Sequence, residues 1–184
     1  MKTYSPAPDV DTCIANIQEE HHSDLDGVSV SALFVFDTEA TEAVLKHQGY
    51  PAAAVVRITP LRERALHQAD ASIVVDRSTW LTMSQRQRNA LIDHELTHLT
   101  RAVDKETSQP LFDVLDRPKL KMRRHDHQFG WFDEIAQRHR DASPEVRQAQ
   151  RLMESSGQLY FEFSTTETSF RKFYVTEHGE ALPA

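Results

Sequence analysis

The stretch Leu91–Leu99 reads LIDHELTHL and contains two histidines four residues apart, with a glutamate directly after the first. Positions i and i+4 lie one above the other on an α-helix, so the side chains of His94 and His98 would meet on one face. Two imidazoles in this arrangement can bind one metal ion, and Glu95 would then lie near its open coordination position. The pattern therefore predicts a helix that carries a metal-binding pair and an adjacent carboxylate.

The surrounding residues favour a helix in this register. Ser84 and Gln87 have the spacing of a capping box at its start. Apolar residues recur at the i, i+4, i+7 and i+11 positions, which predicts a buried stripe. The stripe consists of Ile92, Leu96, Leu99 and Val103. We therefore expect the helix to run through Val103, with Asp93, Thr97 and Thr100 on its solvent-exposed side.

A catalytic zinc site usually has three protein ligands and an open position for water, so a third ligand is needed. Asp104 lies six residues after His98, where the extended motif HExxHxxGxxH has its third ligand. Arg101 occupies the position at which that motif has glycine, which argues against Asp104. Glu134 could supply a carboxylate from a second helix, although a glutamate at such a position is more commonly solvated.

His125 and His127 are the other candidates, in the stretch RRHDHQFGWF. Asp126 is suited to cap a helix that runs to about Arg140, with an apolar stripe facing the core. His125 would extend this inward stripe by one turn, whereas His127 lies away from it. The residues therefore favour His125 as the third ligand, and the other three candidates remain alternatives.

Composition limits the classes of protein to consider. The chain has 184 residues, enough for one domain with its own core, and a formal net charge of −7. This acidic balance argues against a general nucleic-acid-binding surface, although residues 117–124 include five basic side chains in the pattern of an exposed edge strand. Cys13 is the only cysteine, so a metal site must use histidines and carboxylates. No segment resembles a signal peptide or a membrane span, so we expect a cytoplasmic protein.

Apolar runs and helix signals alternate along the chain. Residues 1–8, with two prolines, predict a loose tail, and residues 9–184 predict a single domain. Helices are expected over 9–22 and 38–48 and from Ser143, and strands over 31–36, 52–58 and 72–75, with a hairpin within 159–175. Mixed helices and strands of this kind predict an α+β layer fold, with a small sheet packed against helices.

The segment DHELTHL (93–99), followed about twenty-five residues later by RRHDHQFGWFDEIAQRH (123–139), resembles the phage metallopeptidase family. It is more distantly similar to SprT-like zinc proteases, which also pair HExxH with a later histidine. The upstream segments LFVFD (33–37), LKHQGYPAAAVVRITPLRERA (45–65) and IVVDRSTW (73–80) carry the same resemblance, which spans most of residues 30–140. The HD pair of the second block is the most recognisable element of the family, which favours His125 over His127.

The resemblance implies a compact zincin-like α+β fold, a phage or prophage origin and peptidase activity. The leading hypothesis is that His94, His98 and His125 bind one Zn²⁺ and that Glu95 accepts the proton of the water that hydrolyses a polypeptide substrate. Two carboxylates could orient the imidazoles, Asp93 and Asp126. The alternative is a non-catalytic zinc module that binds a partner protein or DNA. Glu95 favours catalysis, because a structural zinc site needs no general base.

Overall fold

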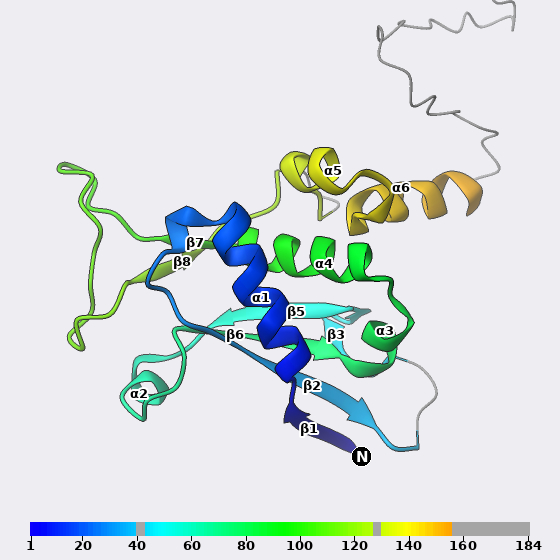
Figure 1. Cartoon of the computed structure of the whole chain (residues 1–184), viewed down its shortest axis with the longest axis horizontal. Coiled ribbons are helices and arrows are strands. Elements are labelled where there is room, and N and C mark those ends of the chain that lie inside the picture. Colours follow the sequence, from blue (N-terminus) through cyan, green and yellow to red (C-terminus); the bar gives the residue numbers. More distant parts are fainter. Residues whose placement is uncertain (40–42, 127–129, 156–184) are drawn as a thin grey trace, which may run out of the picture.

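The computed structural model describes residues 1–39, 43–126 and 130–155 (Figure 1). The strands are β1 (Lys2–Pro6), β2 (Val30–Asp37), β3 (Lys46–His47), β4 (Tyr50–Pro51), β5 (Ala54–Ile58), β6 (Ala71–Asp76), β7 (Leu99–Arg101) and β8 (Leu120–Met122). The α-helices are α1 (Pro8–His21), α2 (Leu61–Arg64), α3 (Arg77–Thr82), α4 (Gln85–Thr97), α5 (Asp133–His139) and α6 (Pro144–Ser155). The described part of the chain mixes helices with a small sheet, which confirms the α+β prediction.

A mixed four-stranded sheet with the order β1-β2-β6-β5 forms one layer. β2 and β6 are parallel, with Val30 opposite Ala71, whereas β1 and β5 run antiparallel to their neighbours. Helices α1 and α4 cover one face of this sheet, and α5 and α6 lie on the far side of α4 (Figure 1). The three predicted strands are confirmed as β2, β5 and β6. No helix in the described ranges is both long and apolar enough to cross a membrane.

The core lies between the sheet and helices α1 and α4. Its buried apolar side chains include Val10, Ile14, Ile17, Ile73, Val75, Ile92 and Leu96. Removing each such side chain from water contributes about 1.5–3 kcal/mol to folding. Trp80 is also buried, and its indole N–H donates a hydrogen bond to the Asp9 carboxylate at 2.8 Å. The sheet and α4 therefore form a rigid base for whatever side chains α4 presents on its outer face.

The N-terminal residues form a strand and not the predicted loose tail. β1 pairs antiparallel with β2, from Lys2 opposite Asp37 to Pro6 opposite Leu33. Proline is tolerated at an edge because one side of an edge strand has no ladder to join. Pro8 is the first residue of α1, where a missing N–H costs nothing. The two prolines that suggested a tail thus suit an edge strand and a helix start.

Helix α4 begins as predicted but ends early. The capping box is present, because Ser84 Oγ accepts from the Gln87 amide and the Gln87 side chain accepts from the Ser84 amide. The helix ends at Thr97, and the next residues pair as β7 with β8. The expectation that it runs through Val103 is wrong, and Val103 is 45% exposed. The predicted strand character of the basic segment is confirmed in β8.

Residues 38–48 contain no helix in their described part, contrary to the prediction. β3 and β4 instead form a small antiparallel hairpin, with His47 opposite Tyr50. Gln48 and Gly49 connect the strands with φ values of 50° and 88°. Positive φ at both central residues is typical of the two-residue turn that matches the twist of a hairpin. Gly49 therefore serves a hairpin turn and not a helix stop.

Two further predictions concern the C-terminal third. Helix α6 begins at Pro144, as the sequence predicts, and the Ser143 hydroxyl accepts a hydrogen bond from the Val146 amide at 3.1 Å. The hairpin predicted within 159–175 lies outside the described residues.

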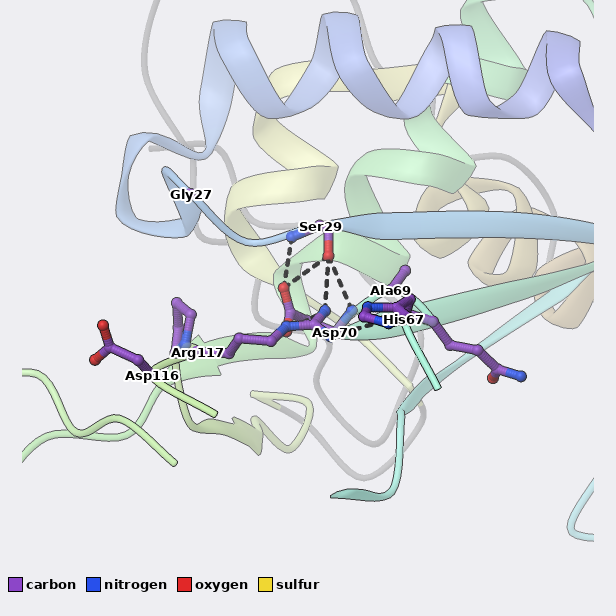
Figure 2. A pocket seen from close by; sticks show the side chains of 9 residues that line it. Gly27, Ser29, His67, Ala69, Asp70, Asp116 and Arg117 are labelled. Atoms are coloured by element: carbon purple, nitrogen blue, oxygen red, sulfur yellow. Dashed lines mark hydrogen bonds and ion pairs between the residues drawn. The ribbon is translucent and has the colours of Figure 1, made fainter. Parts of the chain in front are cut away.

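The long β7–β8 connection is tied to the sheet by a buried carboxylate, Asp70, beside a cavity of about 550 Å³ (Figure 2). The Asp70 carboxylate accepts hydrogen bonds from the Ser29 amide and hydroxyl at 2.8 and 2.7 Å. It also pairs with Arg64 at 2.5 Å and with Arg117 at 2.7 Å. Burial raises the pKa of Asp70, but these hydrogen bonds and guanidinium charges outweigh it and hold the pKa below its usual value.

We expect Asp70→Asn to lower the free energy of unfolding by about 2 kcal/mol near neutral pH, because Arg117 loses its ion pair with Asp70 and the buried Arg64 keeps only its pair with Asp113. A carboxyl group whose pKa is lowered by folding stabilises the protein above its unfolded pKa of 3.8, and this stabilisation is lost as the pH falls through the folded pKa. Urea unfolding of both proteins at about pH 7 and about pH 3.5 should therefore show a smaller difference in acid. The exposed Asp116→Asn serves as control, and an equal difference at both pH values would contradict this prediction.

Candidate metal centre

Three histidines lie together at the C-terminal end of α4. The ligand nitrogen atoms of His94, His98 and His125 are all within 4.8 Å of one another. The Nε2 atoms of His94 and His125 are 3.3 Å apart. In residues 1–39, 43–126 and 130–155, this is the one group of three histidine, cysteine or acidic side chains with the spacing to hold a metal ion.

The β7–β8 pairing explains how His125 reaches the helix. It returns the chain to the end of α4, where the Arg123 amide donates to the His98 carbonyl at 2.7 Å. In the same place, Nδ1 of His98 donates to the Arg123 carbonyl at 2.9 Å. This double contact fixes the segment just before His125. The third histidine therefore depends on strand pairing and not on a helix of its own.

Hydrogen bonds to the outer nitrogens prepare two of the imidazoles for a metal. Nδ1 of His94 donates to the Glu145 carboxylate at 2.7 Å, and Nδ1 of His98 donates to a backbone carbonyl. Because these acceptors require a proton on Nδ1, the Nε2 lone pair of each ring is available for coordination. Neutral imidazoles with this tautomer are the form in which histidine binds zinc, so the residues present fit that ion.

Glu145 is the functional residue that sequence reasoning missed. It lies in the first turn of α6, is 1% exposed and contacts His94, which is 51 residues away in the sequence. From the sequence, Asp93 and Asp126 were the candidates for orienting a ligand imidazole. None of the described hydrogen bonds joins either carboxylate to one of the three ligand histidines. The sequence around Glu145 indicates a helix start and gives no sign of this distant contact.

The ring of Phe132 packs against the whole centre. Its centroid lies 5.0, 4.9 and 4.8 Å from the ring centroids of His94, His98 and His125, and the side chain is fully buried. Gly130 lies nearby with φ +73°, and a Cβ at that position would be 3.7 Å from the His125 ring. An apolar wall of this kind limits solvent access on one side of the site.

Helix α5 begins later than predicted. It starts at Asp133, and Phe132 is its N-cap, so the expectation that Asp126 is the N-cap is wrong. Asp126 still contacts the helix start, because its carboxylate accepts from the Asp133 amide at 3.1 Å. His125 therefore lies in the loop that follows β8 and not, as predicted, at the entry of a helix.

The alternative third ligands are not part of this group where the structure describes them. Asp104 accepts hydrogen bonds from the Glu106 and Thr107 amides at 3.0 and 2.8 Å, as expected of a turn residue. Glu134 pairs with Arg123 at 2.5 Å. His127 lies outside the described residues.

Glu95 is buried between α4 and the edge of the sheet. Its Oε2 accepts a hydrogen bond from the Val56 amide of β5 at 2.9 Å. The Asp76 amide donates to the Ala53 carbonyl, and the Thr59 amide donates to the Asp70 carbonyl. The odd-numbered residues of β5 therefore bond toward β6, and the Val56 amide faces away from β6 and toward α4. Burial raises the pKa of Glu95, and the neighbouring His94 lowers it in part. A carboxylate with a raised pKa is suited to proton transfer.

The electrostatics of the histidines also favour metal binding. Burial lowers the pKa of His98 to about 4, with a further contribution from the charges of His94 and His125. Burial and the charge of His94 likewise lower the pKa of His125. Burial acts in the same direction on His94, but its hydrogen bond to Glu145 and the nearby carboxylates raise its pKa overall. The lowered pKa values of His98 and His125 thus favour the neutral imidazoles that a metal ion binds.

Comparison with known proteins places the chain in a family. The sequence model of the family described as "Putative phage metallopeptidase" matches residues 2–156. The chain belongs to this family. The match confirms the predicted resemblance and extends it on both sides of residues 30–140. No curated protein and no solved structure matches the chain.

In this phage metallopeptidase family member, Asp93 anchors the helices behind the metal centre. It was predicted to be solvent-exposed, but it is fully buried and pairs with His22 at 2.7 Å, Arg138 at 2.5 Å and His139 at 2.6 Å. Burial raises the pKa of Asp93, but these hydrogen bonds dominate and lower it. The contacts join α4 to α1 and α5, and α5 directly follows Phe132. Asp93 therefore helps to hold the apolar wall of the site.

We expect Glu145→Gln to weaken zinc binding about tenfold, because the amide lacks the negative charge that supports the His94 imidazole. Competitive titration against a chromophoric chelator measures this affinity. Glu154→Gln, an exposed change on the same helix, is the matched control and should bind zinc as the wild type does. Equal zinc affinities for all three proteins would show that Glu145 does not support zinc binding.

Proposed function

We propose that the protein is a zinc-dependent peptidase with a zincin-like arrangement, in which His94, His98 and His125 bind the ion and Glu95 is the general base. The observation that carries this proposal is a group of three histidines whose ligand atoms lie within 4.8 Å of one another, with the buried Glu95 directly after His94 on the same helix. Membership of a metallopeptidase family supports it. Three neutral protein ligands leave a position for a substrate or water, as in catalytic zinc sites.

Bound zinc would supply a Lewis acid that polarises the peptide carbonyl and lowers the pKa of water. The protein's own residues supply the proton transfers. Glu95 accepts the proton of the attacking water and passes it to the leaving amine. Its raised pKa favours the first transfer, because a more basic carboxylate takes the proton of the attacking water more readily.

The Val56 amide has a role in this sequence of steps. Its hydrogen bond holds the Glu95 carboxylate in one orientation before the proton arrives. Phe132 and the buried end of α4 exclude bulk solvent from one side of the histidines. These contacts support the proposed roles of Glu95 as base and of Phe132 as an apolar wall beside the histidines.

A second candidate function is a non-catalytic zinc module that binds a partner protein or DNA. The exposed residues Lys119, Lys121 and Arg124 around β8 favour it, because they form a basic strip on an otherwise acidic protein. The two functions differ in their response to chelation. A catalytic site should lose activity in EDTA and stay folded, whereas a structural zinc site should unfold by circular dichroism.

The experiment that tests the proposed function is a search for new peptide termini. A bacterial lysate is incubated with the zinc-loaded wild type or with Glu95→Gln, and the free amino termini are labelled and identified by mass spectrometry. We expect termini that appear with the wild type alone, from polypeptide substrates in the cytoplasmic fraction. Identical sets of termini for the two proteins would contradict peptidase function.

A further inference from the structure

The strand β8 leads directly into the metal centre (Figure 1). Its last residue, Met122, lies opposite Leu99, which follows His98 in the chain. The next amide, that of Arg123, donates to the His98 carbonyl at 2.7 Å. His125 lies three residues after Met122, and three residues span at most about 10 Å of extended chain. β8 therefore ends beside the three histidines.

The outer edge of β8 has no neighbouring strand among the described residues, because β7 and β8 form a sheet of two strands. Odd-numbered residues of β8 and its flanks bond toward β7. The Lys119 carbonyl accepts from the Ala102 amide at 2.8 Å, and the Arg123 amide donates to the residue just before β7. Main-chain groups alternate in direction along a strand, so those of Leu120 and Met122 point away from β7. They are available to pair with an added strand.

The main sheet also has an edge strand near the site, β5, but this edge is engaged. Its Val56 amide donates to the buried Glu95 carboxylate at 2.9 Å. An incoming strand would have to displace that hydrogen bond, whereas no hydrogen bond between described residues uses the outer edge of β8. β8 is therefore the better template for an extended polypeptide.

The side chains of β8 and its flanks indicate the chemistry of such a polypeptide. Lys119 and Lys121 share one face, are solvent-exposed and form no ion pair in the described part of the chain. Arg123 lies on the same face, but Glu134 pairs with it at 2.5 Å. Met122, on the opposite face, is 47% exposed. Two uncompensated positive charges on a protein of net charge −7 favour an acidic partner.

We propose that the outer edge of β8 binds the polypeptide substrate as an added strand, and that Lys119 and Lys121 select acidic residues at alternate positions of that substrate. This assignment rests on the proposed function. Main-chain hydrogen bonds to an exposed edge hold a peptide extended, and alternate side chains provide specificity. Side chains directly opposite in paired strands share a face, so an aspartate or glutamate opposite each lysine forms an ion pair. The residue between them lies on the face of Met122, which favours an apolar side chain.

The test measures peptide binding by fluorescence anisotropy. The protein is zinc-loaded Glu95→Gln, so that bound peptide is not cleaved, and both probes are fluorescein-labelled ten-residue peptides. Aspartates alternate with valines in the first peptide, and lysines replace the aspartates in the second. We expect the aspartate peptide to bind about tenfold more tightly than the lysine peptide. Equal affinities would overturn the proposal.

Charge reversal on β8 gives the sharper comparison. In the same background, Lys119→Glu with Lys121→Glu should reverse the preference, so that the lysine peptide binds more tightly. Lys46→Glu with Lys105→Glu changes the net charge equally at exposed lysines elsewhere and should keep the original preference. Because the readout is a ratio of two affinities, a partial loss of folded protein does not mimic the reversal. An unchanged preference in the β8 variant overturns the proposal.

Two further probes test strand pairing and the nature of the partner. N-methyl groups on alternate amides of the aspartate peptide remove the donors that face β8 in one frame and spare them in the other. We expect these two methylated peptides to differ about tenfold in affinity, and equal binding would contradict strand pairing. A ten-nucleotide single-stranded DNA that bound more tightly than the aspartate peptide, and lost binding on charge reversal of β8, would assign the lysines to nucleic acid and overturn the proposal.

Cleavage by the zinc-loaded wild type separates this proposal from the proposed function. If the aspartate peptide binds β8 as expected but neither it nor fluorescein-labelled casein is cleaved, the peptidase function fails and the peptide-binding edge stands. If casein is cleaved but charge reversal leaves the peptide preference unchanged, the β8 assignment fails and the peptidase function stands.

Discussion

Glu95→Gln should bind zinc as tightly as the wild type and hydrolyse peptides about a thousandfold more slowly. Glutamine has nearly the same shape as glutamate but cannot accept a proton at neutral pH. Its carbonyl oxygen can still accept the hydrogen bond from the Val56 amide, which the wild-type carboxylate accepts at 2.9 Å. The fold and the three histidines should therefore be preserved, and only proton transfer should be lost.

The measurement combines the rate of casein hydrolysis with zinc content by mass spectrometry of the purified proteins. Glu63→Gln, a change in the short helix α2 away from the centre, is the control and should retain full activity. A Glu95→Gln protein with wild-type activity would exclude Glu95 as the base. A variant that also lost its zinc would show instead that the carboxylate supports the metal centre.

His125→Ala should lower zinc affinity by more than about 100-fold, because a site with two protein ligands replaces one with three. His125 contributes one of the three nitrogens within 4.8 Å, and its Nε2 lies 3.3 Å from that of His94. The sheet and the buried stripe of α4 do not depend on this side chain. We therefore expect the variant to remain folded and to lose activity together with zinc.

His127→Ala is the sharpest comparison for this prediction. It removes the other histidine of the same segment, two residues along, and should leave zinc affinity unchanged. Competitive titration with a chelator gives both affinities under the same conditions. If His127→Ala lost zinc and His125→Ala retained it, the third ligand would be His127 and the present assignment would be wrong.

Local patterns in the sequence were sufficient for some elements. The capping box of Ser84 and Gln87 predicted the start of α4, and Ile92 and Leu96 predicted its core-facing side, since both depend on neighbours within one or two helical turns. The prediction that Asp93 and Thr97 face solvent was wrong, because both are buried. The apolar runs of β2 and β6 were equally clear, because both strands are central in the sheet.

Contacts between residues far apart in the sequence determine the structural features that local patterns did not predict. Residues 38–48 have the composition of a helix, but Asp76 binds the Val44 and Leu45 amides from 32 and 31 residues away and holds the described part of this segment as a hairpin. The α4 helix ends at Thr97 because β7 pairs with β8, a contact that the apolar stripe does not encode. Long-range pairing of this kind overrides local preference.

The candidate site, too, was predicted from local sequence only in part. The pair His94 and His98 follows from helical spacing alone. His125 was the favoured third ligand for the wrong local reason, since a loop fixed by Arg123 carries it and not a helix entry. Glu145 reaches His94 from α6, and no spacing in the sequence connects it with α4.

The central claim is a three-histidine zinc centre with an open position, and anomalous diffraction at the zinc absorption edge from crystals of the zinc-loaded protein tests it most directly. The account predicts one strong peak about 2.0–2.1 Å from Nε2 of His94, His98 and His125, with no fourth protein ligand. Absence of a peak between these three rings, or a peak whose coordination is completed by a fourth side chain, would contradict it.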